Sequence, residues 1–342
     1  MSTHELKAVA KALVAKGKGI LAADESTGTI EKRFQKINLP NTEENRRNYR
    51  ELLFRTKGAG QYVSGAILYE ETLKQKAADG TTMVDLMNRE GIVPGIKVDK
   101  GAVDLAGAPG EKVTEGLDGL RARCAEYYKL GARFAKWRAV ITIGDGIPSA
   151  YCLEANAHAL ARYAKLCQEQ GLVPIVEPEV LMDWSNSIEV CYDVTRRTLE
   201  CTFDALYAQR VSLEEMLLKP NMVIAGKQCP KQASAREVAE ETICCFRRSV
   251  PAAVPGIVFL SGGQSEAQAT ENLNEMNKLG PHPWELSFSY GRALQDSALK
   301  AWAGQQANLA KGQRAFLHRS KMNGLARSGK YDSAMEKELV GV

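Results

Sequence analysis

The sequence contains little histidine. Only four of its 342 residues are histidines, and no two of them stand four positions apart: His4, His158, His282 and His318. Zinc sites are commonly built from histidines that a short spacing or a shared helix brings together. We therefore expect no metal in the functional site.

Long apolar runs and clusters of like charge are missing too. No segment reaches the roughly 18 apolar residues that a membrane span needs, and the N-terminus has no unbroken apolar stretch of secretory length. The 45 Lys and Arg nearly balance the 41 Asp and Glu, without a run of five like charges. We expect no membrane span and no nucleic-acid partner.

No C-x-x-C pair occurs among the eight cysteines, which run from Cys124 to Cys245. Free thiols in a reducing compartment are the expected state, so we predict a cytoplasmic protein. The composition, 44% hydrophobic and 25% charged, is ordinary for a globular chain with a sizeable core.

Short β-rich runs alternate with longer amphipathic segments along the chain, as expected for parallel strands joined by helices. The eight runs are GILAADES from residue 19, SGAILYEE from 64, GIVPGIKVD from 91, RFAKWRAVITI from 133, LVPIVEPEV from 172, LLKPNMV from 217, GIVFLSGG from 256 and WELSFSYG from 284.

The helices between these runs have recognisable ends. Ser234 and Glu237 form a capping-box pattern, and a helix between Ser149 and Gly171 has a cap at each end. A helical region is expected from about Ala293 to about Arg327.

We predict a single domain, a TIM (β/α)₈ barrel over about residues 19–310 with additional N-terminal helices and a C-terminal helical tail over about 311–342. An open doubly wound sheet is the main competitor, but the G-x-G-x-x-G turn typical of that fold is absent after the first strand.

Charged residues interrupt several predicted strands near their carboxyl ends. Same-face pairs occur as Lys97 with Asp99, Lys136 with Arg138 and Glu177 with Glu179, while Asp24 and Lys219 add single charges. A single residue of this kind is equally consistent with a charge exposed to solvent at the end of a strand. Five strands with this feature indicate a shared mouth at which the charges are each other's partners.

Glycine-containing turns follow the last two predicted strands, in LSGGQSE and SFSYGR. Glycine lets the backbone approach a ligand, and amides at a helix N-terminus suit a phosphate. With Ser265 as a helix cap and Arg292 as a guanidinium donor, these turns predict a phosphate site.

Lys219 lies within the apolar run LLKPNMV. Desolvation and nearby cations disfavour a charged amine, and a neutral amine attacks carbonyl carbon to form an imine that accepts electrons when a C–C bond breaks. Glu177 is the candidate for moving protons during imine formation, and either Asp24 or Glu177 could take the hydroxyl proton during cleavage. The residues predict a Schiff-base lyase or transferase acting on a phosphorylated carbonyl compound.

Eight motifs together resemble class I fructose-1,6-bisphosphate aldolase of the eukaryotic type, from about residue 5 to about 331: GILAADESTGTIEKRF, NTEENRR, GIKVDKG, FAKWRAV, VPIVEPEV, LLKPNMV, FLSGGQSE and SFSYGRALQ. The resemblance implies a TIM barrel, a homotetramer, roles in glycolysis and gluconeogenesis, and no metal or other cofactor. It also implies fructose 1,6-bisphosphate and triose phosphates as ligands, with cytoskeletal binding of the actin type as a compatible secondary role.

The resemblance also implies roles for the charged residues of the mouth. Lys219 matches the Schiff-base lysine, and Glu177 the acid/base of imine formation and cleavage. Asp24 matches the carboxylate at the C4 hydroxyl, Lys136 the neighbouring lysine, and Glu179 a supporting carboxylate.

The matching motifs further imply a substrate-binding set. The C1-phosphate end is expected to include Ser261, Gly262, Gly291 and Arg292, and the C6-phosphate end Ser26, Thr29 and Lys97. Arg33 and Arg138 line the same mouth, and Gly263 and Ser289 complete the substrate-binding set. Thr29 replaces a serine common in the family but keeps the hydroxyl.

One feature departs from the family pattern. Members usually carry a longer C-terminal tail ending in a tyrosine that assists proton exchange on the enamine, whereas this sequence ends LVGV. Either the sequence is truncated or the proton is handled differently, and we expect cleavage to survive with slow exchange.

Other classes stay open at this point. A transaldolase or deoxyribose-phosphate aldolase would share the lysine but need one phosphate site, and the basic residues near Lys97 and Arg33 favour two. A scaffold or interaction protein on the same barrel would be expected to have lost a member of the catalytic set.

Overall fold

Eight parallel strands close into a barrel in the computed structural model, which describes residues 3–339. In sheet order they are β1 (Gly19–Ala23), β10 (Glu285–Tyr290), β9 (Gly256–Phe259), β8 (Leu217–Leu218), β7 (Val173–Val180), β6 (Phe134–Ile141), β3 (Val93–Lys97) and β2 (Val63–Leu68), and β2 pairs with β1. The predicted TIM barrel and its eight strands are confirmed. The final residues of the LVGV ending, 340–342, lie outside the described residues.

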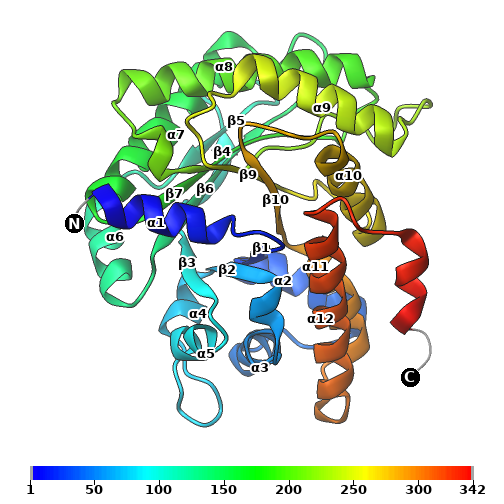
Figure 1. Cartoon of the computed structure of the whole chain (residues 1–342). Coiled ribbons are helices and arrows are strands. Elements are labelled where there is room, and N and C mark those ends of the chain that lie inside the picture. The colour runs from blue at the N-terminus through cyan, green and yellow to red at the C-terminus, as the bar shows by residue number, and fades with distance from the viewer. Residues whose placement is uncertain (1–2, 340–342) are drawn as a thin grey trace.

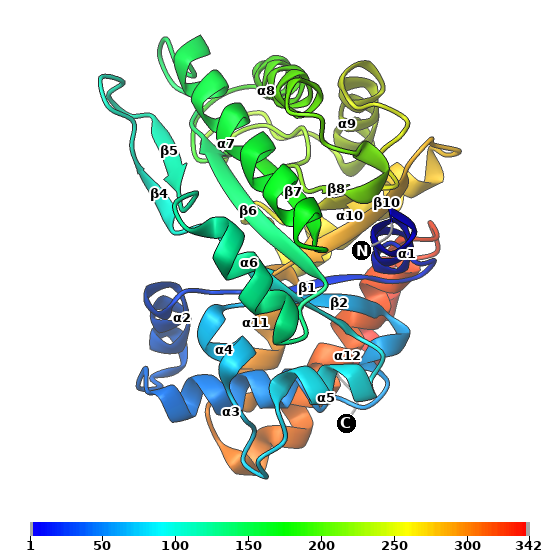
Figure 2. The same cartoon turned by 90° about the vertical axis from the view of Figure 1, so that its left-hand side faces the viewer.

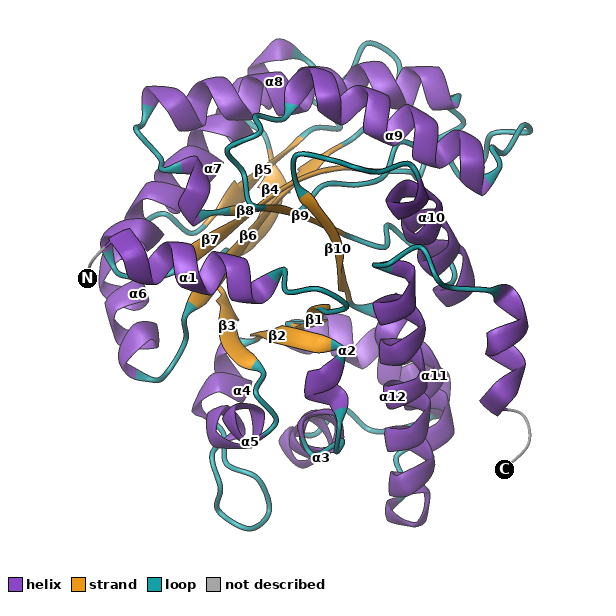
Figure 3. Cartoon of the chain, in the orientation of Figure 1, coloured by secondary structure: helices purple, strands orange, loops and turns teal. Residues whose placement is uncertain are grey.

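Helices surround the strand ring (Figures 1 and 3). They are α1 (Thr3–Leu13), α2 (Thr27–Phe34), α3 (Glu43–Phe54), α4 (Glu70–Lys74), α5 (Met83–Arg89), α6 (Leu120–Lys129), α7 (Ala150–Glu169), α8 (Ile188–Ala208), α9 (Ala235–Ser249), α10 (Glu266–Lys278), α11 (Arg292–Trp302) and α12 (Leu309–Ala326). Short 3₁₀ turns are η1 (Gln35–Ile37), η2 (Ala59–Gln61), η3 (Leu213–Glu215), η4 (Gln306–Asn308) and η5 (Ser333–Leu339).

The expected helix caps are present. The Ser234 hydroxyl accepts from the Glu237 backbone N–H while the Glu237 side chain accepts from the Ser234 backbone, which completes the capping box of α9. The hydroxyls of Ser149 and Ser265 cap α7 and α10 by accepting from the N–H groups of Cys152 and Gln268, and Gly171 follows α7 with a φ of +80°. These local hydrogen bonds satisfy N–H groups that a helix leaves without an internal partner.

The C-terminal helical region is two helices rather than one. Ala303 and Gly304 both have positive φ, 52° and 73°, and they end α11 before α12 begins. The two helices then pack side by side (Figure 1).

A two-stranded antiparallel hairpin, β4 (Gly101–Asp104) and β5 (Lys112–Glu115), follows β3 and was not predicted. It projects away from the barrel (Figure 2).

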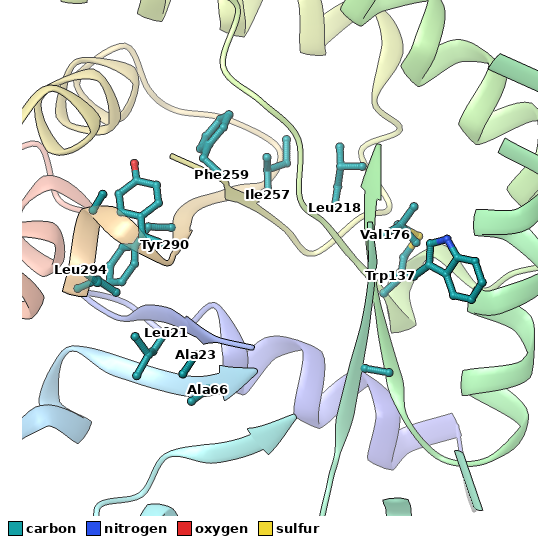
Figure 4. Packing of buried hydrophobic residues seen from close by; sticks show 14 of the residues in the cluster. Leu21, Ala23, Ala66, Trp137, Val176, Leu218, Ile257, Phe259, Tyr290 and Leu294 are labelled. Atoms are coloured by element: carbon teal, nitrogen blue, oxygen red, sulfur yellow. The ribbon is translucent and has the colours of Figure 1, made fainter. Parts of the chain in front are cut away.

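The larger part of the core lies between the strands and the helices. Trp137 and Tyr290 extend outward from β6 and β10 (Figure 4). Trp137 stacks on Tyr163 of α7 with ring centroids 5.6 Å apart, and the Tyr290 hydroxyl donates to Ala269 O of α10 at 2.8 Å. These contacts fix the helices against the outside of the barrel.

A second apolar cluster fills the amino-terminal end of the barrel. Helix α1 crosses this end (Figure 1) and contributes Leu6 and Leu13, which pack, together with Val14 directly after the helix, with inward-facing strand residues such as Phe134. The first residue of β9, Gly256, lies so close that an added Cβ would be 2.5 Å from Val14 Cγ1. The barrel is therefore closed at this end and open at the other.

The end of the chain secures this closure. The buried Arg327 guanidinium donates to Val14 O at 2.7 Å, to Ala15 O at 3.2 Å and to Leu286 O of β10 at 2.6 Å. One side chain therefore joins the segment after α12, the segment after α1 and a barrel strand.

Candidate active site

A cavity of about 550 Å³ opens at the carboxyl ends of the strands. Its wall contains every predicted catalytic and substrate-binding residue except Gly263: Asp24, Ser26, Thr29, Arg33, Lys97, Lys136, Arg138, Glu177, Glu179, Lys219, Ser261, Gly262, Ser289, Gly291 and Arg292. The strand ends bring together residues separated by up to 268 positions in sequence, as the barrel topology predicts.

Lys136 lies at the centre of a buried charge cluster. Its Nζ is 2.7 Å from Asp24 Oδ2, 3.4 Å from Glu177 Oε2 and 3.9 Å from Asp99 Oδ2. The side chains of Lys136 and Glu177 are 5% and 4% exposed, respectively, so water screens these interactions weakly. The charges are each other's partners, as predicted.

Lys219 stands immediately after a very short strand. Its N–H donates to Val176 O of β7 at 2.8 Å, but Pro220 has no N–H to continue the ladder, so β8 ends at Leu218. The Lys219 Nζ is 3.2 Å from Glu177 Oε1. Glu177 therefore lies between two amines, Lys219 on one oxygen and Lys136 on the other.

Further charged residues surround the Lys136 cluster, and the parallel register of the strands positions them. On adjacent strands β6 and β7, Arg138 pairs with Glu177 in register, while the Arg138 guanidinium contacts Glu179 Oε2. Lys97 Nζ is 3.3 Å from Asp99 Oδ1, whose other oxygen accepts from the Arg138 backbone N–H at 3.3 Å. Asp99 thus links β3 to β6.

The pKa shifts of Asp24 and Lys136 indicate that both groups are charged at neutral pH. Burial raises the pKa of Asp24, but the Lys136 and Lys219 ammoniums outweigh burial and hold this pKa well below its usual range. Burial lowers the pKa of Lys136, but the Asp24, Glu177 and Asp99 carboxylates outweigh it and raise this pKa above the ordinary lysine value. At neutral pH Asp24 is an ionised hydrogen-bond acceptor and Lys136 is a cation.

Two glycine turns form the opposite wall. Gly262 and Gly263 have φ of +55° and +83°, which glycine tolerates best. Gly263 does not line the cavity: a Cβ added to it would be 2.8 Å from Lys227 Nζ and 3.3 Å from an Arg292 NH2. At this turn the backbone therefore lies close to the cationic side chains of Lys227 and Arg292.

Gly291 and Ser289 complete this wall. Gly291 is the N-cap residue of α11, which begins at Arg292, so the amides of the first turn of α11 are directed toward the cavity mouth. The Ser289 hydroxyl is buried and lacks a hydrogen-bond partner among residues 3–339. A free hydroxyl beside a helix N-terminus and a guanidinium suits a bound phosphate.

Among the cavity residues that were not predicted as part of the site, three are charged and were not singled out at all: Glu25, Lys32 and Lys36. Lys32 and Lys36 stand four positions apart, so helical spacing on a segment already assigned to the mouth could have indicated them. Glu25 follows Asp24 directly, yet two of its contacts, Arg50 and Gln295, are 25 and 270 positions away. Asp99 was recognised only as the partner of Lys97.

Outside this cavity, the described part of the chain shows no second cluster of the predicted residues. Residues 3–339 contain no group of three or more His, Cys, Asp or Glu placed to hold a metal ion, and no helix among them is long and apolar enough to cross a membrane. Another groove, of about 580 Å³, lies between α12 and the loop before β2 and holds none of the predicted residues.

Comparisons with known proteins agree with one another. The family model described as fructose-bisphosphate aldolase class-I matches residues 5–340. The chain is 61% identical over 332 residues to a probable fructose-bisphosphate aldolase class 1 of Xanthomonas axonopodis pv. citri, covering 97% of this chain and 99% of that protein.

A relative from Toxoplasma gondii, fructose-bisphosphate aldolase 1, is 59% identical over 96% of this chain and 91% of its own length. Among solved structures, the fructose-bisphosphate aldolase of Plasmodium falciparum in complex with TRAP and a small-molecule inhibitor superposes with a TM-score of 0.96 at 56% identity, covering 96% of both chains.

Proposed function

Since this chain belongs to the class-I fructose-bisphosphate aldolase family, lyases that cleave fructose 1,6-bisphosphate reversibly to dihydroxyacetone phosphate and glyceraldehyde 3-phosphate, we propose that Lys219 forms the imine on which cleavage depends. The observation that carries the proposal is the 3.2 Å contact between Lys219 Nζ and Glu177 Oε1 in the wall of the cavity. A nucleophilic amine must first lose a proton, and Glu177 is within reach of it.

The proposed cycle begins when Lys219 Nζ adds to the C2 carbonyl of the ketose. Glu177 then protonates the C2 hydroxyl of the carbinolamine, water leaves, and a protonated imine remains. The C4 hydroxyl loses its proton, the C3–C4 bond breaks, and its electron pair moves into the imine to give an enamine and glyceraldehyde 3-phosphate. Protonation of the enamine at C3 and hydrolysis release dihydroxyacetone phosphate.

The carboxylates of Asp24 and Glu177 have different roles in this scheme. With its pKa held below the usual range, Asp24 is a weak base that stays ionised. We therefore assign it to orient the C4 hydroxyl by accepting its hydrogen bond, and assign the proton transfer to Glu177. Lys136 lies between the two carboxylates and helps to keep Asp24 ionised, and Glu179 holds Arg138.

The two phosphates are assigned to opposite sides of the mouth. The C1 phosphate would meet Ser261, Gly262, Ser289, Gly291 and Arg292, with Gly263 behind the turn, and the C6 phosphate would meet Ser26, Thr29, Arg33, Lys97 and Arg138. The Ser26 and Thr29 hydroxyls, 3.1 Å apart, form a pair at the start of α2.

Borohydride trapping tests the Lys219 assignment. Dihydroxyacetone phosphate and borohydride should label wild-type Lys219 irreversibly, as read by peptide mapping, while Lys219→Arg should keep the charge but lose the label and cleavage. Lys97→Arg keeps the same type of charge in the same cavity and should still label at Lys219. Label on another lysine, or cleavage that requires added metal, would overturn the assignment.

We also propose a cytoplasmic homotetramer. A 58% identical Arabidopsis thaliana relative is named as cytosolic, and exposed apolar side chains on and near α7 and α8, including Tyr151, Trp184 and Tyr207, offer surface for self-association. Light scattering of the purified protein would measure the assembly. Actin-type cytoskeletal binding remains a secondary proposal that rests on the family resemblance, and filament co-sedimentation tests it.

A further inference from the structure

The Glu25 carboxylate is buried at the base of the mouth and contacts three helices. Its Oε1 is 2.6 Å from the Arg33 guanidinium of α2 and accepts from Gln295 Nε2 of α11 at 3.2 Å. Its Oε2 accepts from Arg50 NH2 of α3 at 2.7 Å. We refer to Glu25, Arg33, Arg50 and Gln295 as the Glu25 cluster.

Gln295 is held on both sides of its amide. Its Nε2 also donates to Ala22 O of β1 at 2.7 Å, and its Oε1 accepts from the buried Tyr49 hydroxyl at 3.0 Å. Tyr49 in turn stacks on Trp302 at the end of α11, with centroids 5.6 Å apart. Because Gln295 has no solvent exposure and few alternative partners, the cluster has little freedom to rearrange.

The Glu25 cluster adjoins both phosphate walls. Arg33 lines the cavity on α2, the helix that begins beside Ser26 and Thr29. Gln295 lies one turn after Arg292 at the start of α11. The two walls nearly meet here, since a Cβ added to Gly291 would be 3.5 Å from Arg33 NH2.

The Glu25 cluster has an excess of positive charge that an anion could balance. Glu25 offsets one of the two arginine charges it contacts, so the buried group of side chains has an excess of one positive charge. Arg33 stays 14% exposed while Glu25 is 3% exposed. Although Glu25 lines part of the cavity, its side chain is less exposed than that of Arg33, so the part of Arg33 that the carboxylate does not contact is available to the cavity.

We propose that Glu25 is a positioning residue that fixes the α2 and α11 walls relative to each other and so sets the preference for a substrate with two phosphates over one with a single phosphate. The inference rests on the proposed function, because it assigns the two phosphates to these walls. Glu25 acts through Arg33 and Gln295 without contacting the reacting carbons. A substrate anchored at one wall is insensitive to the distance between the walls, whereas a bisphosphate must satisfy both at once.

Steady-state kinetics with fructose 1,6-bisphosphate and fructose 1-phosphate test the proposal. In Glu25→Gln we expect KM for the bisphosphate to rise about tenfold with little change in KM or kcat for the monophosphate. The ratio of the two kcat/KM values would then fall about tenfold, which corresponds to about 1.4 kcal/mol. Gln295→Met, which lies outside the cavity, should shift the ratio in the same direction.

Glu71→Gln is the matched control. Glu71 also pairs with an arginine of α3, with Oε2 at 2.6 Å from Arg46 NH2, but it lies outside the cavity. It should leave the substrate ratio unchanged. Equal losses on both substrates in Glu25→Gln and Gln295→Met would indicate a structural role only and overturn the proposal, as would unchanged kinetics in both.

Trapping separates this inference from the Lys219 assignment. Labelling with dihydroxyacetone phosphate should be retained at Lys219 in Glu25→Gln, because the triose bears one phosphate. Labelling elsewhere in wild type would refute the imine assignment, whereas an unchanged substrate ratio with normal labelling would refute only the role of Glu25. If Glu25→Gln does not fold, the ratio in Gln295→Met decides.

Discussion

Replacing Lys136 with methionine should remove the cation that three buried carboxylates share. Asp24 then loses its ion-pair partner, whereas Glu177 keeps Lys219 and Asp99 keeps Lys97. The carboxylate oxygens lie 2.7, 3.4 and 3.9 Å from the Lys136 Nζ, on Asp24, Glu177 and Asp99, respectively. Removing one partner of a buried ion pair costs about 3–5 kcal/mol, because the other charge stays buried without its partner. At roughly 2 °C per kcal/mol for a chain of this size, we expect Tm near pH 8 to fall by about 6–10 °C.

The loss should depend on pH. In the wild type, Asp24 has a pKa below its ordinary value of 3.8, so its contribution to stability is present above pH 3.8 and lost as pH falls through the lower folded value. Without Lys136, burial, which raises this pKa, is opposed only by the charges of Lys219 and Lys97, and we expect burial to prevail. The variant's stability should then decrease as pH rises through the raised pKa.

The difference in unfolding free energy between wild type and Lys136→Met should consequently grow from pH 5 to pH 8. Urea unfolding at both pH values measures it, with Lys129→Met, at an exposed position of α6, as the control. Adding Asp24→Asn to Lys136→Met should restore part of the stability while cleavage remains lost. A difference below about 1 kcal/mol, or one equal at both pH values, would refute the reasoning.

Two other substitutions have defined outcomes. Gly263→Ala places a Cβ on a residue with φ of +83°, a left-handed conformation that alanine disfavours, and displaces the Lys227 ammonium, whose Nζ would lie 2.8 Å from that Cβ. We expect a loss of about 1–2 kcal/mol in urea unfolding and a higher KM for both phosphorylated ketoses, and an unchanged KM would show that this turn does not shape the phosphate wall. Arg327→Met leaves the buried carbonyls of Val14, Ala15 and Leu286 without this donor, and should cost about 1–3 kcal/mol with faster proteolysis near α1; equal proteolysis rates would contradict this.

The barrel could be predicted from the sequence because its signals are local. Each strand is a short β-rich run, and several helices carry their own caps, as α9 does at Ser234 and Glu237. The shared mouth followed from topology, since parallel strands place Lys136 and Glu177 at one end whatever their separation in sequence.

The features that were missed depend on weaker or non-local signals. The hairpin β4–β5 has two four-residue strands in which only Thr114 is buried, so no apolar pattern marks it. The break between α11 and α12 needs a left-handed alanine, which propensity does not favour. The contact of Glu25 with Gln295 spans 270 positions, and only the closed barrel brings them together.

The bonds from Arg327 to the segment after α1 bear on synthesis of the chain. The carbonyls of Val14 and Ala15 receive these bonds from a residue 313 and 312 positions later, respectively. A nascent chain therefore cannot complete the closed end of the barrel until translation has passed residue 327, however early α1 leaves the ribosome. Until then the apolar face of α1, with Leu6 and Leu13, is a surface for chaperones to cover.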